Sequence, residues 1–222
     1  MMTFQNVLNG RRVASPTSFE SFNPATGEVL GLVPRSTPEQ VAQAVAAARA
    51  AQPAWAARPD AERQALVMQV AQAIEAHSEE LAAWVTREQG KPLGGVGPGQ
   101  VPGARFEVFG CKVWTEVPAS LQIPVEVAFE DATRRDEVHR VPFGVVAAIA
   151  PWNWPLLIAV WQMIPAIRAG NTVVIKPSEY TSIGTLEMVR LIAEVLPPGV
   201  VNTVSGAADV GAALVDHPGV DK

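Results

Sequence analysis

The fold is decided by residues 142–179, PFGVVAAIAPWNWPLLIAVWQMIPAIRAGNTVVIKPSE. The first part, 145–150, is a short apolar run between a glycine and a proline, which is typical of a strand buried on both faces. A second β-branched run, 172–175, has the same character. Between the two, 156–168 carries apolar residues on most faces and predicts a buried helix that begins at Pro155. The order strand, helix, strand predicts a right-handed βαβ unit of a parallel sheet.

Polar side chains follow both predicted strands, at the point where each strand ends. Asn153 comes after the first strand, and Lys176, Ser178 and Glu179 come after the second. In an open α/β sheet, ligands bind outside the carboxyl ends of the strands. We therefore predict that these residues face one crevice.

The chain downstream of this unit repeats the pattern. Spacing predicts a helix over 181–195 with Thr181 as its N-cap, and then a third buried strand over 200–204. The following turn, 205–211, is built from small residues and opens a helix that ends near Asp216. Such a turn lets the backbone approach a phosphate, although only Gly206 and Gly211 of a glycine-rich fingerprint are present.

The chain upstream is predicted to contain a β-hairpin within 11–33 and then several helices. Thr37, Pro38 and Gln40 are a helix start, and we expect Asp60 and Ser78 to cap the next two helices. Five glycines and two prolines within 94–103 predict a loop. Helical character resumes over 105–113, where Phe106, Phe109 and Val113 share one side. Residues 121–142 read as two strands joined by a polar turn, a half-exposed hairpin.

Composition excludes several classes of protein. A net charge of −5 and a pI near 5.3 argue against nucleic acid as a partner. No apolar run reaches the length of a membrane span, and the N-terminus lacks the apolar core of a signal peptide. The single cysteine, Cys111, is interpreted as a small buried hydrophobe, and His77 and His139 as surface residues. We expect a cytoplasmic protein without a metal site.

The motifs PWNWPL (152–154 at its centre) and IKPSE (175–179), at this distance, resemble the aldehyde dehydrogenase superfamily. Further similar segments are SFNPATGEVL (21–30), EQGKPL (88–93), RVPFGVVAAIAPWN (140–153) and HPGVDK (217–222). The resemblance therefore covers nearly the whole chain. It departs from the family at 94–103, where the family has a helix.

The resemblance implies an NAD-dependent oxidation of an aldehyde, with NADP as a second possible cofactor. In the family a cysteine thiolate attacks the aldehyde, hydride passes to the nicotinamide, and a glutamate activates water. By resemblance Asn153 donates its side-chain amide to the oxyanion, and Lys176 and Glu179 hold the adenosine ribose. Ser178 softens the preference of Glu179 for NAD. The cofactor site so implied comprises Ile149, Ala150, Pro151, Trp152, Asn153, Lys176, Ser178, Glu179, Gly206 and Gly211.

The same resemblance divides the chain into three parts. Residues 1–120 are the N-terminal hairpin and helical part of a cofactor-binding domain, 121–142 an oligomerisation hairpin, and 143–222 its Rossmann-like βαβ part. The hairpin implies a homodimer or homotetramer. The family's catalytic cysteine and general base have no counterparts here, so we expect the chain to be an N-terminal part that is inactive alone.

Two hypotheses of function stay open at this point. The first is an aldehyde dehydrogenase of which this chain is the cofactor-binding part. The second is a non-catalytic nucleotide-binding or assembly module derived from one. The sequence does not identify the aldehyde. Trp161 and Gln162 suit a channel for an apolar or aromatic substrate, while Trp161 is equally suited to the core.

Overall fold

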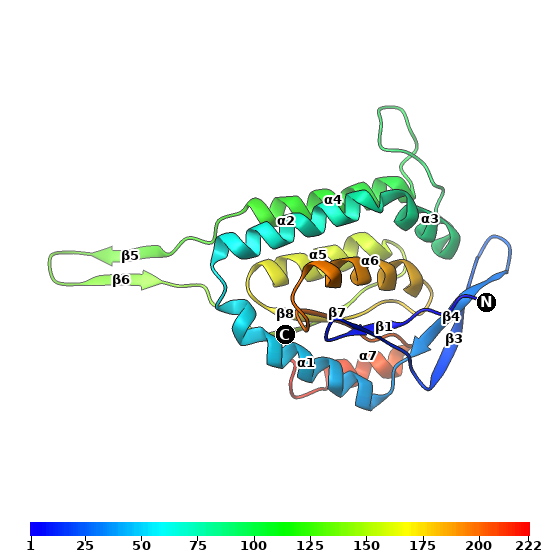
Figure 1. Cartoon of the computed structure of the whole chain (residues 1–222). Helices are drawn as coiled ribbons and strands as arrows, with labels where there is room; N and C mark the ends of the chain where they lie inside the picture. Colours follow the sequence, from blue (N-terminus) through cyan, green and yellow to red (C-terminus); the bar gives the residue numbers. More distant parts are fainter.

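A computed structural model describes all 222 residues, and a small parallel sheet lies at its centre (Figure 1). The strands are β7 (Val145–Ile149), β8 (Thr172–Lys176) and β9 (Val201–Thr203), in the order β7-β8-β9. Both pairs are parallel, with Val145 opposite Thr172 and Ile149 opposite Lys176. The α/β fold and its βαβ units, predicted from the sequence, are confirmed.

Strand β7 corrects one detail of that prediction, because it is not buried on both faces. It is an edge strand, and Ile149 at its end is exposed. The last residues of the chain lie along its outer side, where Asp221 N–H donates to Val145 and Ala147 N–H donates to Lys222. The central strand β8 and the predicted third strand, β9, are buried at every residue, as expected.

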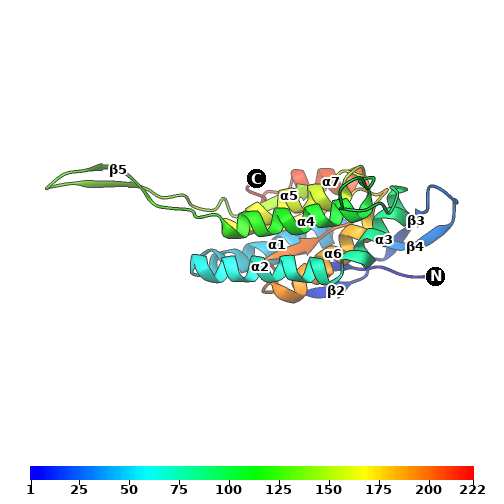
Figure 2. The ribbon, with the colours of Figure 1, turned by 90° about the horizontal axis from the view of Figure 1, so that it is seen from above.

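Helices cover both faces of the sheet (Figures 1 and 2). On one face lie α5 (Pro155–Arg168) and α6 (Ser182–Val195), and on the other lie α1 (Pro38–Ala56) and α7 (Ala208–Val215). A further layer packs outside α5 and α6 and contains α2 (Asp60–Ala76), α3 (Ser78–Gln89) and α4 (Ala104–Ser120). The main core is the layer between these helices, around Leu156, Met163 and Ile192.

The N-terminal segment forms two antiparallel pairs. One is β1 (Asn6–Leu8) with β2 (Arg11–Val13), and the other is β3 (Thr17–Phe22) with β4 (Val29–Arg35). The β3–β4 pair is the predicted hairpin, whereas β1 was not predicted because its three residues carry no alternating pattern. Strand β1 lies beside β9, where Val7 N–H donates to the Thr203 hydroxyl at 2.7 Å.

Of the caps predicted for the first three helices, one is correct and two are wrong. Thr37 and Gln40 form the predicted capping box at the start of α1. Asp60 and Ser78 are the first residues of their helices and give no cap hydrogen bond. Asp60 instead binds the buried Arg168 guanidinium with both carboxylate oxygens, at 2.5 and 2.8 Å. The Asp60 side chain, which the local pattern assigns to a cap, therefore binds a residue distant in the sequence.

The glycine- and proline-rich segment is a loop, as predicted, and it stands clear of the body between α3 and α4 (Figure 1). Its two ends are tied together, because Ala104 N–H donates to the Pro92 carbonyl at 2.8 Å. Helix α4 starts there. Phe106 and Phe109 lie on its exposed side, while Val108 and Cys111 face the core.

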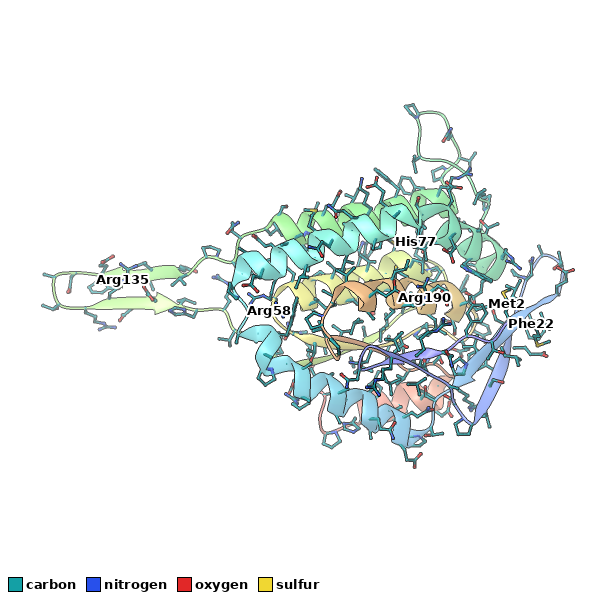
Figure 3. All side chains as sticks on the ribbon, in the orientation of Figure 1. Met2, Phe22, Arg58, His77, Arg135 and Arg190 are labelled. Carbon is teal, nitrogen blue, oxygen red and sulfur yellow. The ribbon has the colours of Figure 1, made fainter.

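Strands β5 (Glu126–Glu130) and β6 (Arg135–Val138) form the predicted hairpin. It projects far from the body, and Arg135 lies well away from every helix (Figures 2 and 3). Its apolar side chains, including Val127, Phe129 and Val138, are exposed. None of the helices of the chain combines the length and the apolar character that crossing a membrane requires.

Candidate active-site edge of the sheet

The first predicted site residue lies on the turn between β7 and α5. Ala150 and Pro151 leave the sheet, and Ala150 N–H still donates to the Lys176 carbonyl at 3.0 Å. Trp152 and Asn153 then reach the surface, where both are exposed. Pro155 occupies the first helical position of α5. Asn153 is exposed, and its carboxamide makes no hydrogen bond within the chain.

The second group lies at the end of β8. Lys176 is 4% exposed, and its ammonium donates to the Pro177 carbonyl at 2.9 Å. It lies 3.7 Å from a carboxylate oxygen of Glu179, whose side chain is partly exposed. Burial lowers the pKa of Lys176, while the charges of Glu179 and Asp209 oppose that shift. The pair therefore presents one accessible carboxylate backed by a largely buried cation.

Three other predicted site residues, Ser178, Gly206 and Gly211, determine the local backbone conformation and packing. Ser178 is buried, and its hydroxyl oxygen accepts the Tyr180 N–H at 3.3 Å, which shapes the turn. Gly206 has φ of +151°, and an added Cβ would meet the Val210 side chain at 2.4 Å. Gly211, on α7, faces the stem of Lys176, which an added Cβ would meet at 3.5 Å. Lys176, Glu179 and α7 thus lie together.

The two turns open on one edge of the sheet, because Ile149 and Lys176 are paired across the ladder. A cleft of about 580 Å³ lies beside them and is lined by Trp152 and Glu179 together with residues of the β3–β4 hairpin, among them Phe22. This volume is in the range of small-molecule sites. Asn153 is next to the lining residue Trp152 but does not line the cleft itself.

Sequence reasoning missed two buried carboxylates behind these turns. Glu107, on α4, accepts the backbone N–H groups of Leu156 and Leu157, at 2.9 and 3.3 Å, at the start of α5. Glu88, on α3, accepts those of Ile183 and Gly184, at 2.8 and 3.0 Å, at the start of α6. Each carboxylate therefore caps a helix that follows a site turn. The only available signal was an acidic residue within an otherwise apolar helical pattern.

The charge of each carboxylate is balanced differently. Glu107 is 0% exposed and pairs with the Lys91 ammonium at 2.5 Å. Glu88 has no cation beside it and takes a hydrogen bond from the Ser21 hydroxyl at 2.7 Å. Burial raises the pKa of Glu88 to about 7, against the opposing effect of hydrogen bonds from the Ser21 side chain and from the backbone of Ser182, Ile183 and Gly184.

Two further predictions concern thiol and indole groups. Cys111 is fully buried, and burial raises the pKa of its thiol well above the usual value, which excludes it as a ready nucleophile. Trp161 is 43% exposed and packs on Trp114 with ring centroids 5.2 Å apart. Of the two readings left open for Trp161, the core position is wrong. Gln162 donates to the Ile149 carbonyl at 3.1 Å.

These features define an α/β fold of the doubly wound type. An exposed amide and a lysine–glutamate pair lie at the carboxyl edge of its sheet, where such folds bind ligands. The model of the aldehyde dehydrogenase family matches residues 12–222. The chain belongs to this family, and the resemblance noted in its motifs is confirmed.

Individual relatives agree with that assignment. The chain is 37% identical to 2-aminomuconic semialdehyde dehydrogenase of Bos taurus over 99% of its own length and 45% of that protein. It is 38% identical to fluoroacetaldehyde dehydrogenase of Streptantibioticus cattleyicolor, covering 96% of the chain and 40% of that protein. It superposes on the NAD+ complex of aldehyde dehydrogenase from Bacillus cereus with a TM-score of 0.91 at 32% identity, over 100% of the chain and 45% of that structure. The chain thus spans less than half the length of these relatives.

Proposed function

We propose that the chain forms the cofactor-binding side of an enzyme that oxidises an aldehyde to a carboxylic acid with NAD, or alternatively NADP. The observation that carries this proposal is the exposed Asn153 carboxamide at the same sheet edge as the Lys176–Glu179 pair. A structure of a relative with NAD+ bound, at a TM-score of 0.91, supports the choice of cofactor. The relatives that act on semialdehydes and fluoroacetaldehyde support an aldehyde as substrate.

The residues fit a nucleotide of this kind. A partly exposed carboxylate, Glu179, is suited to accept both hydroxyls of a ribose and would repel a 2′-phosphate. Lys176 lies 3.7 Å from that carboxylate and orients it from a buried position. Ile149, Ala150, Pro151 and Trp152 would form the neighbouring wall, and Trp152 lines the cleft. Gly206 and Gly211 are buried against Val210 and Lys176 and would let α7 pack close to the pair. Ser178 holds the turn that carries Glu179.

The bound nicotinamide ring would supply the hydride acceptor. Asn153 would donate its amide N–H to the oxygen of the aldehyde as that oxygen becomes negative after attack by a thiolate. Cys111 is buried and has a raised pKa, so the nucleophile must come from polypeptide outside these 222 residues. We therefore expect the 222-residue chain to bind the cofactor without oxidising aldehydes.

The domain division belongs to the same proposal: 1–120 and 143–222 bind the cofactor, and 121–142 mediates oligomerisation. The projecting β5–β6 hairpin, with Val127, Phe129 and Val138 exposed, supports pairing with another subunit in a homodimer or homotetramer. The single free cysteine supports a cytoplasmic location.

Calorimetric titration of the purified chain with NAD tests the proposal. We expect Glu179→Gln to weaken NAD binding about tenfold, because hydrogen bonds to a charged group are worth roughly 1.5–3 kcal/mol. The same variant should narrow the preference for NAD over NADP. Glu194→Gln removes an exposed carboxylate from the far end of α6 and serves as the control. Equal affinities of the wild type and Glu179→Gln would refute the assignment of this residue.

A further inference from the structure

We infer that Lys91 and Glu107 are positioning residues for the Asn153 carboxamide. The inference rests on the proposed function, since it explains how the proposed oxyanion donor is held in place. Neither residue reaches the surface position of the amide. Both act on the backbone that carries it: Lys91 lies just after α3 and Glu107 lies in α4, on either side of the 94–103 loop.

Lys91 contacts the turn at two successive residues. Its ammonium donates to the Asn153 carbonyl at 3.1 Å and lies 3.7 Å from the centre of the Trp154 ring. Phe106 packs on the same ring, with its edge toward it, at 6.5 Å. An ammonium over an indole face is attracted by the ring, more strongly where water is excluded. The carbonyl and the ring fix the backbone on both sides of the bond between Asn153 and Trp154.

Glu107 connects this ammonium to the helix. One of its oxygens binds Lys91 at 2.5 Å, and the other accepts the N–H groups of Leu156 and Leu157. A carboxylate buried this completely is stable only when it is paired and hydrogen-bonded, and here both conditions hold. Because Trp154 supplies no cap, Glu107 determines where α5 begins. Lys91 and Glu107 therefore hold the chain from the Asn153 carbonyl to the first turn of α5.

The Asn153 carboxamide has no hydrogen bond of its own within the chain, so its location depends on the backbone alone. Catalytic donors lose much of their effect when they move by about 1 Å, up to roughly 10²-fold in rate. Loss of the Lys91 contacts would free the turn, and it would also leave the buried Glu107 carboxylate without its cation. Lys91 thus restrains the backbone that carries the Asn153 amide, which an ordinary surface lysine would not do.

Nuclear magnetic resonance of the 222-residue chain tests the inference without any activity. We would follow the Asn153 side-chain amide and the Trp154 indole N–H in the wild type, in Lys91→Met and in Lys112→Met. Lys112 lies on α4 and pairs with Glu75 at 2.7 Å, so it is a matched ion-paired control away from the turn. We expect Lys91→Met alone to shift both signals and to broaden the Asn153 signal through exchange.

If Lys91→Met leaves both signals unchanged, the inference is wrong. Should that variant fail to fold, relaxation measurements on the wild type decide: an Asn153 backbone as mobile as the tip of the β5–β6 hairpin would overturn the inference. In a catalytically complete polypeptide, Lys91→Met should lower kcat at least about tenfold with KM for NAD unchanged, and Lys112→Met should change neither. Absence of NAD binding by the wild type would refute the proposed function but not the backbone restraint.

Discussion

Helices α5 and α6 begin on neighbouring turns of the same sheet edge, and the two starts are stabilised in contrasting ways. Neither helix has a cap from its own N-cap residue, Trp154 or Thr181. A buried glutamate from the outer helical layer caps each instead, Glu107 for α5 and Glu88 for α6. Only Glu107 has a cation beside it.

The two glutamates show that a buried carboxylate can cap a helix either with or without a cation beside it. With Lys91 as its partner, Glu107 caps α5 as a charged pair, and the pair also holds the Asn153 turn. Glu88 caps α6 with backbone and hydroxyl donors only, which do not fully offset the loss of water around its charge. The α6 start is therefore expected to depend on pH near neutrality.

The largest effect is expected at the paired carboxylate. Glu107→Ala leaves the Lys91 ammonium without its partner and two N–H groups of α5 without an acceptor. We expect the free energy of unfolding to fall by about 3–5 kcal/mol, the usual cost of breaking a buried pair. Urea denaturation followed by circular dichroism measures it. Glu116→Ala, an exposed carboxylate of the same helix, should change the value by less than about 1 kcal/mol. Similar losses in both variants would show that Glu107 is not a buried cap.

A smaller, pH-dependent effect is expected at Glu88. Its pKa is near 7 in the folded chain and about 4.5 when unfolded, so the folded state binds more protons between these values. Stability from this group is therefore complete below pH 4.5 and is lost as the pH rises to about 7. Relative to the wild type, Glu88→Gln should gain stability across that window, by on the order of 3 kcal/mol in total.

Urea denaturation of both proteins from pH 5 to pH 8 tests this slope. Any constant offset from altered hydrogen bonds in Glu88→Gln cancels, because only the change with pH is compared. Glu80→Gln, which alters an exposed carboxylate of the same helix, is the control. A wild-type curve parallel to that of Glu88→Gln would show that Glu88 is ionised without penalty.

These two glutamates also show why part of the site was not predictable from the sequence. The 142–179 unit was recognised because its apolar runs and turn residues lie within one continuous segment. Glu107 is 49 residues away in the sequence from Leu156, whose N–H it accepts, and Glu88 is 95 residues away from Ile183. A local pattern places an acidic residue of a helix in solvent, and only the packed layers reveal what lies opposite. Asp60 was assigned to a cap for the same reason.

The smallest expected effect concerns the residue that the sequence nominated as the α6 cap. Thr181 occupies the N-cap position, but its buried hydroxyl has no hydrogen-bond partner. At α1 the Thr37 hydroxyl accepts the Gln40 N–H at 3.3 Å and completes a capping box. Thr37→Val should therefore lower the free energy of unfolding by about 1 kcal/mol. Thr181→Val should lower it by less than about 0.5 kcal/mol or raise it, because an unpaired buried hydroxyl is replaced by a methyl group.

The same urea measurements on Thr37→Val and Thr181→Val compare a true cap with a nominal one in a single chain. Equal losses would mean that Thr181 takes part in capping α6 and that Glu88 is not sufficient for it. In the background of Glu88→Gln, Thr181→Val should remain nearly neutral, since the Thr181 hydroxyl makes no hydrogen bond and the N–H groups of Ile183 and Gly184 are bound by Glu88. A loss of unfolding free energy that appears only in this double variant would show that Thr181 caps α6 when Glu88 does not. The start of α6 would then resemble that of α1 more closely than the structure suggests.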